Sequence, residues 1–168
     1  MSITDSSGAT ASRVAPPSET EESEKWHRRF AMRCNNRAWE LSVMSRSAAE
    51  DREMLSVAHA SVWHWEQVGT ELNRMRAKML LAEVHALLGF GPSAFSLASE
   101  ILNYFSTRDT PDWEIALTHT IYAHAAHAAG KSTKHRAAYA KAVAAIGVIE
   151  NAEERDIVSK TFENIPVP

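Results

Sequence analysis

The sequence contains one cysteine, Cys34, among its 168 residues. A single thiol can form neither an intrachain disulfide nor the multi-thiolate cage of a structural zinc site, so both are excluded. No stretch approaches the ~20 consecutive apolar residues that a membrane-spanning helix requires. The first residues also lack the basic start and apolar block of a secretory signal. These absences predict a protein of the reducing cytoplasm that has no membrane partner.

Glycine and proline are scarce, with six of each, and most of them lie near the chain ends or between helical patterns. That placement argues against an all-β fold, which needs turn residues at short intervals. The chain also lacks an excess of positive charge. It has 18 lysines and arginines and 21 acidic residues, which gives a formal net charge of −3. No nucleic-acid partner is expected, since such binding requires a basic face.

The first 24 residues differ in composition from the rest of the chain. They are rich in Ser, Thr, Glu and Pro and carry five acidic residues against one arginine. A segment this poor in large apolar groups cannot offset its chain entropy by burial, so residues 1–24 are predicted to form a disordered acidic tail. Residues 25–168 are predicted to form a single helical domain, and their length is sufficient for a substantial core.

Nearly all of that domain shows apolar residues at helical spacing. Ser47 with Glu50, and Asn151 with Glu154, have the spacing of helix-starting capping boxes. We therefore predict an all-α fold of six or seven antiparallel helices arranged as stacked helical hairpins. The expected helices span residues 25–44, 48–68, 71–88, 93–106, 112–129, 133–149 and 152–163.

Residues 71–149 contain a weak internal repeat. Each copy begins with an alanine, has a histidine or alanine three positions later, and has a glycine four positions after that. Two alanines, four residues apart, follow the glycine. This pattern resembles the tetratricopeptide helix pair, although the Trp-Leu-Gly start and the terminal proline of that motif are missing. The resemblance implies an antiparallel stack of helix hairpins. The residues that carry it are Ala82, His85, Gly89, Ala94 and Ala98, then Ala123, Ala126, Gly130, Ala138 and Ala142.

A second resemblance covers residues 28–166. Its motif consists of Asn36, Trp39 and Leu41, followed by His59, Ala60, Ser61, His64, Trp65, Val68, Gly69, Thr70, Asn73 and Arg76. This run is similar to a widespread, uncharacterised family of small bacterial helical proteins. The resemblance implies a helical fold and a bacterial origin, and it implies no chemistry.

Polar and aromatic residues of the first three expected helices suggest a site. If these helices form a bundle, one polar cleft walled by aromatic rings is expected, and such a cleft suits a small ligand or a peptide. An internal hydrogen-bond network that fixes helix register is the alternative explanation. The candidate residues are Asn36, Trp39, His59, His64, Trp65, Asn73 and Arg76.

His124 and His127 are weak candidates for metal ligands. They are three residues apart, which places them about 60° apart around a helix, so they can share a ligand. A metal site would still require a carboxylate or another histidine from a different helix. The alternative is that both are surface or hydrogen-bonded core histidines. No metal, other cofactor or catalytic residue is predicted.

The preferred functional prediction is a non-catalytic, cytoplasmic interaction module that holds a protein or peptide partner. The alternative is a small-ligand or metal-dependent enzyme centred on His59 and His64. A third possibility is self-association as a homodimer, because the end hairpins of a helix stack expose apolar flanks.

Overall fold

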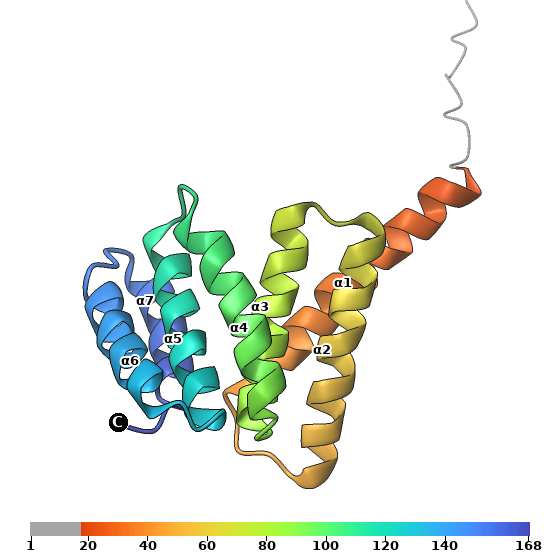
Figure 1. Ribbon diagram of the computed structural model, residues 1–168. Helices are drawn as coiled ribbons and strands as arrows, with labels where there is room; N and C mark the ends of the chain where they lie inside the picture. The colour runs from red at the N-terminus through yellow and green to blue at the C-terminus, as the bar shows by residue number, and fades with distance from the viewer. Residues whose placement is uncertain (1–17) are drawn as a thin grey trace, which may run out of the picture.

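The computed structural model describes residues 18–168, and this part of the chain forms seven α-helices and no strands. The predicted all-α fold is therefore confirmed (Figure 1). The predicted disorder of residues 1–17 lies outside the described residues. The helices are α1 (Glu19–Ser42), α2 (Ala48–Val68), α3 (Glu71–Leu87), α4 (Gly91–Ser106), α5 (Asp112–Ala128), α6 (Ser132–Gly147) and α7 (Ala152–Phe162).

The first helix begins earlier than predicted. Residues 19–24, which we placed in the tail, form the first turns of α1. The cause is a capping box: the Ser18 hydroxyl accepts a hydrogen bond from the Glu21 amide, and the Glu21 carboxylate accepts one from the Ser18 amide. The acidic side chains of this first turn also interact favourably with the helix dipole.

The other helix ends follow local rules that the sequence displays. The capping box of Ser47 and Glu50 starts α2 as predicted, and the Asn151 side chain caps α7 by accepting hydrogen bonds from two backbone amides. Gly89 and Gly130, just beyond α3 and α5, have φ of 76° and 66°. Glycine adopts this left-handed conformation without steric cost, so it suits the end of a helix.

Successive helices pack side by side as antiparallel pairs, which agrees with the predicted stacking of hairpins. Each odd-numbered helix also contacts the next odd-numbered one: α1 contacts α3, α3 contacts α5, and α5 contacts α7. The odd helices therefore form one row. α5 contacts α3, α4, α6 and α7 and is buried on several sides, as its apolar composition predicts.

Two main apolar clusters hold the row together. One joins α3, α4, α5 and α7 around Phe105 and Ile121, and the other joins α1, α2 and α3 around Leu41 and Met54. Trp39 packs against both clusters. In residues 18–168, no helix combines the length and apolar character needed to cross a bilayer.

Candidate functional site

The four odd helices enclose a cavity of about 250 Å³, which we call the odd-helix cavity. Its walls are mainly apolar, and its charged and amide groups come from Asn35, Arg76 and Glu114. Arg76 and Ile157 both retain substantial solvent exposure, so the cavity opens to the surface. The lining residues are Asn35 and Trp39 from α1, Arg76 and Met79 from α3, Trp113, Glu114 and Leu117 from α5, and Ile157 from α7.

An ion pair between α3 and α5 forms the polar part of this cavity. Arg76 donates from Nε to Glu114 Oε1 at 2.6 Å and from Nη2 to Glu114 Oε2 at 3.0 Å. The Glu114 side chain is only 2% exposed, whereas that of Arg76 is 42% exposed. Hydrogen bonding to Glu114 raises the pKa of Arg76, so the guanidinium stays charged and the buried carboxylate stays compensated.

The indole of Trp113 lies beside this ion pair, with the Arg76 Cζ atom 5.6 Å from the ring centre. This is within the range of a cation–π interaction. Arg76 Nη1 forms no hydrogen bond within the described part of the chain. Arg76, which lines the cavity, therefore keeps one guanidinium nitrogen available as a donor.

The sequence positions of the cavity residues show how the fold builds it. Trp39, Arg76 and Trp113 lie at equal intervals of 37 residues along the chain. Each comes from a different odd helix, so one helical hairpin separates each residue from the next. The cavity is therefore assembled by stacking, and each of the four odd helices contributes one to three side chains to its lining.

Of the predicted site residues, the structure brings Trp39 and Arg76 to this cavity. Asn36 does not line it; this residue is exposed, and its neighbour Asn35 lies there instead. Adjacent helical residues point about 100° apart, so a one-residue error moves a side chain off the site. Met32 and Val43, which share the helical spacing of Trp39 on this helix, are both exposed.

The two histidines of the enzyme alternative lie in separate clusters. His64 contacts His27 of α1, with 3.0 Å between their Nδ1 atoms. His59 contacts His85 of α3, with 3.5 Å between their Nε2 atoms. The single polar cleft that was expected to join His59, His64 and Arg76 is not formed.

The remaining two residues of that expected cleft have local structural roles. Asn73 forms the capping box of α3 with Thr70. Trp65 is partly buried and packs beside Gly69 at the turn between α2 and α3. Both residues therefore contact the turn between α2 and α3, and neither lines the odd-helix cavity.

His124 and His127 do not share a ligand-binding arrangement. His124 is buried, and its Nδ1 donates to both carboxylate oxygens of Glu83 at 2.9 and 3.0 Å. His127 is exposed and faces the ring of His135. Across residues 18–168, no group of three or more His, Cys, Asp or Glu side chains is arranged to hold a metal ion.

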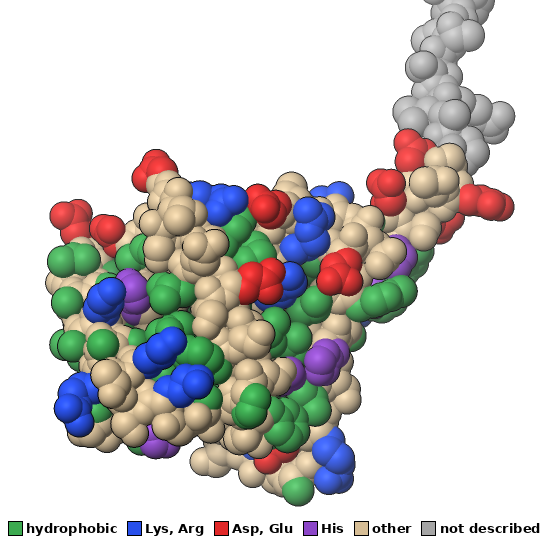
Figure 2. All heavy atoms as spheres, in the orientation of Figure 1, with side chains coloured by type: hydrophobic (Ala, Val, Ile, Leu, Met, Phe, Trp, Pro, Cys, Tyr) green, Lys and Arg blue, Asp and Glu red, His purple; other side chains and the backbone are tan. Residues whose placement is uncertain are grey.

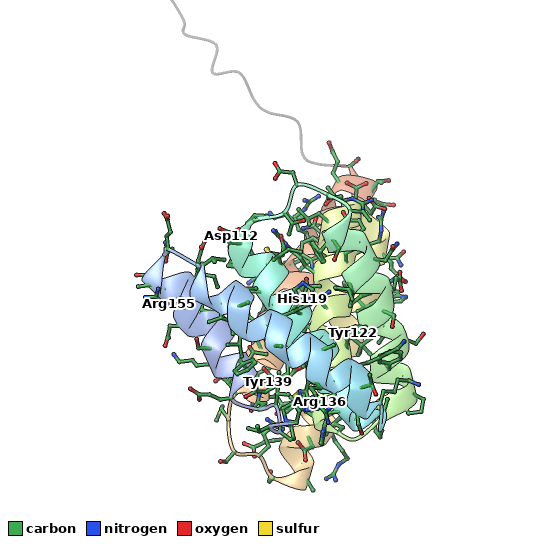
Figure 3. All side chains as sticks on the ribbon, turned by 60° about the vertical axis from the view of Figure 1, so that its left-hand side comes forward. Asp112, His119, Tyr122, Arg136, Tyr139 and Arg155 are labelled. Atoms are coloured by element: carbon green, nitrogen blue, oxygen red, sulfur yellow. The ribbon has the colours of Figure 1, made fainter. Side chains whose placement is uncertain are left out.

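A second cavity, of about 490 Å³, lies on a different face among α4, α5 and α6. His119 and Tyr122 lie on α5 between the two flanking helices (Figure 3), and Lys134 and Lys141 of α6 complete the basic side. Burial, followed by the charge of Lys141, lowers the pKa of His119. Its lining includes no carboxylate, so any ligand here would meet a positive environment.

The chain matches no protein-family model, no curated protein and no solved structure. The two resemblances noted in the sequence therefore stay predictions. The site residues that sequence reasoning missed are Asn35, Met79, Trp113, Glu114, Leu117 and Ile157. One signal was present in the sequence, namely the 37-residue interval that leads from Trp39 through Arg76 to Trp113.

Proposed function

We propose that this protein is a non-catalytic helical interaction module that binds a peptide segment of a partner protein in the odd-helix cavity. The observation that carries the proposal is the Arg76–Glu114 ion pair, with its unused Nη1 donor, in the lining of a mainly apolar cavity. Concave apolar sites with a few placed polar groups are typical of ligand and peptide recognition.

The chemistry of the lining indicates what the bound segment provides. Trp39, Trp113 and Leu117 offer apolar surface to an aliphatic or aromatic side chain. Glu114 already neutralises Arg76, so the Nη1 donor suits an uncharged acceptor such as a peptide carbonyl. An extended segment that inserts one apolar side chain and presents a backbone carbonyl beside it satisfies both features.

The apolar wall of Ile157 extends this recognition surface. Ile157 lines the cavity from α7 while the residue stays 58% exposed. Exposed aliphatic residues at the rim of a pocket lose solvent contact when a partner binds, which is a favourable contribution of roughly 25 cal/mol per Å². Binding in the cavity therefore gains from covering α7 as well as from filling the space between α3 and α5.

The test is selection of peptides from a displayed random library on the purified chain, followed by measurement of their affinities by calorimetry. Ile157→Glu places a charge at the cavity rim and is expected to weaken the selected peptides at least tenfold. Val143→Glu is the matched control, because Val143 is a similarly exposed aliphatic residue on α6 that does not line the cavity. Recovery of no binding peptide, or equal affinity for both variants, would contradict the proposal.

A further inference from the structure

The N-terminal half of α1 has an exposed face on which the side-chain types follow a definite order. The sequence places Glu19 and Glu22 first, then Trp26, then Arg29 and Arg33. Phe30 accompanies Trp26 in the middle. At 100° per residue, these six positions fall within about 100° of arc, so they form one stripe along the helix. We call it the α1 stripe.

Every residue of the α1 stripe is exposed. Trp26 and Phe30 stay 44% and 41% exposed although both are large and aromatic. Their rings stack with centres 5.7 Å apart, and the Arg29 Cζ atom lies 5.2 Å from the Trp26 ring centre. The stripe is therefore an ordered apolar patch flanked by charges, which is the composition of an interaction surface.

The charged residues of the stripe have no ion-pair partners within the described chain. No ion pair of residues 18–168 includes Glu19, Glu22, Arg29 or Arg33. Further along α1, by contrast, Arg37 is paired with Glu40 and with Glu53 of α2. The stripe therefore retains two unpaired charges of each sign.

The order of charges identifies what covers the stripe. Glu19 lies seven residues before Trp26 and Arg33 lies seven after it; Glu22 and Arg29 lie four before and three after. If a second copy of the stripe lies antiparallel, with the two-fold axis beside Trp26, both acidic residues of each copy face both arginines of the other. The charges of the stripe are therefore complementary to those of a second copy related by a two-fold rotation.

We infer that the protein forms a two-fold symmetric homodimer through antiparallel packing of the α1 stripe. An isologous interface of this kind uses the same patch on both subunits. Trp26 and Phe30 of each copy form the apolar centre, and four ion pairs form the rim. The inference does not depend on the odd-helix cavity, whose α1 residues Asn35 and Trp39 lie further along the helix.

The shape of the molecule permits this packing. The first turns of α1 extend beyond the other helices, so a second helix has access to them (Figure 1). The space-filling view shows acidic side chains gathered on these turns, with hydrophobic side chains next to them along the right-hand face (Figure 2). A partner helix at the usual interaxial distance of ~8–10 Å would cover both.

Charge reversal gives a test that separates pairing from folding. Glu19→Lys with Glu22→Lys makes the stripe wholly basic, and Arg29→Glu with Arg33→Glu makes it wholly acidic. Each double variant repels itself, whereas each matches the other. By sedimentation analysis of the full chain we expect twice the 18.6 kDa chain mass for the wild type, the single mass for either variant alone, and the doubled mass for their equimolar mixture.

Two controls complete the experiment. Lys25→Glu with Arg28→Glu makes the same change of charge on the same helix but outside the stripe, and this variant is expected to dimerise like the wild type. Trp26→Ala removes the apolar centre and is expected to raise the dimer dissociation constant at least tenfold. A monomeric wild type, a dimeric charge-reversal variant, or a mixture that stays monomeric would each overturn the inference.

Discussion

The Arg76 guanidinium binds the buried carboxylate of Glu114 through two hydrogen bonds and thereby joins α3 to α5 at the odd-helix cavity. The two partners differ in exposure, since Glu114 is buried and Arg76 is not. This difference sets the order of their mutational effects. A carboxylate left alone in the interior loses its compensation, whereas an arginine left alone at the surface is rehydrated.

Replacing Arg76 should therefore destabilise the protein more than replacing Glu114. For Arg76→Met we expect a loss of about 2 kcal/mol in the free energy of unfolding, because a buried charge loses its partner. For Glu114→Gln we expect about half of that, roughly 1 kcal/mol, because the amide still accepts one hydrogen bond. Urea unfolding of both variants measures the difference, and the reverse order would contradict this account.

The pair formed by His124 and Glu83 makes a second prediction. Both side chains are buried between α3 and α5. His124→Leu leaves the Glu83 carboxylate without its partner and should cost about 3–5 kcal/mol. The double variant Glu83→Leu with His124→Leu replaces the pair by apolar groups of similar volume.

The double variant should recover most of the lost stability, because a well-packed apolar pair is often as stable as a buried hydrogen-bonded polar pair. Urea unfolding of the wild type, both single variants and the double variant forms a complete cycle. A double variant as unstable as the sum of the two single variants would show that Glu83 and His124 act independently.

Much of the fold was predictable because helix starts and helix faces are local properties. Ser47 with Glu50, and Asn151, marked real helix starts. The signal for α1 was also present at Ser18 and Glu21, but the acidic composition around it outweighed it in the prediction of a tail. α5 packs against four other helices, in keeping with the apolar residues on several of its faces.

Six of the eight cavity residues were not predictable in the same way. Periodicity tells which side of a helix is buried, but it does not tell which sides of different helices meet. Trp39 and Arg76 were singled out, whereas Trp113 and Ile157 lie 37 and 81 residues beyond Arg76 and had no local signal. His59 and His64 were grouped because they are close in the sequence. Five residues on a helix place them about 140° apart, so they join different neighbours.

Acid should destabilise the protein through its histidines. Burial, followed by the charge of His59, lowers the pKa of His85, and burial followed by His27 lowers that of His64. The folded state therefore binds fewer protons than the unfolded state, whose histidines titrate near about 6.5. By linkage, the free energy of unfolding falls as pH decreases below that value.

The measurement is urea unfolding between pH 7.5 and 5.5, above the range in which most carboxylates titrate. His85→Gln removes one of the perturbed groups, and the dependence of stability on pH should become weaker in this variant. An unchanged slope would mean that His85 makes no contribution to the acid sensitivity.

Replacement by alanine should have opposite effects on stability at two glycines, Gly91 and Gly147. A Cβ at Gly91, at the start of α4, would lie 2.2 Å from the backbone oxygen of Ala128. Gly91 and Ala128 both lie at packed helix ends, so Gly91→Ala must move α4 away from α5. This movement should lower the free energy of unfolding by at least about 2 kcal/mol. A Cβ at Gly147 would meet nothing within 4 Å.

Gly147→Ala should stabilise the protein by about 0.5–1 kcal/mol, because alanine restricts the unfolded chain and favours helix. Thermal unfolding of the two variants gives shifts of opposite sign. A neutral Gly91→Ala would indicate that the contact between α4 and α5 relaxes easily.

The position of α7 at the end of the row has a consequence for the dynamics of the binding site. α7 is the last helix of the row, and it packs on α5 and, less extensively, on α6. End units of stacked helical proteins open locally before the rest unfolds. Since Ile157 forms one wall of the odd-helix cavity, transient opening of α7 would admit a peptide, and a bound peptide would slow hydrogen exchange in α7 more than in α2.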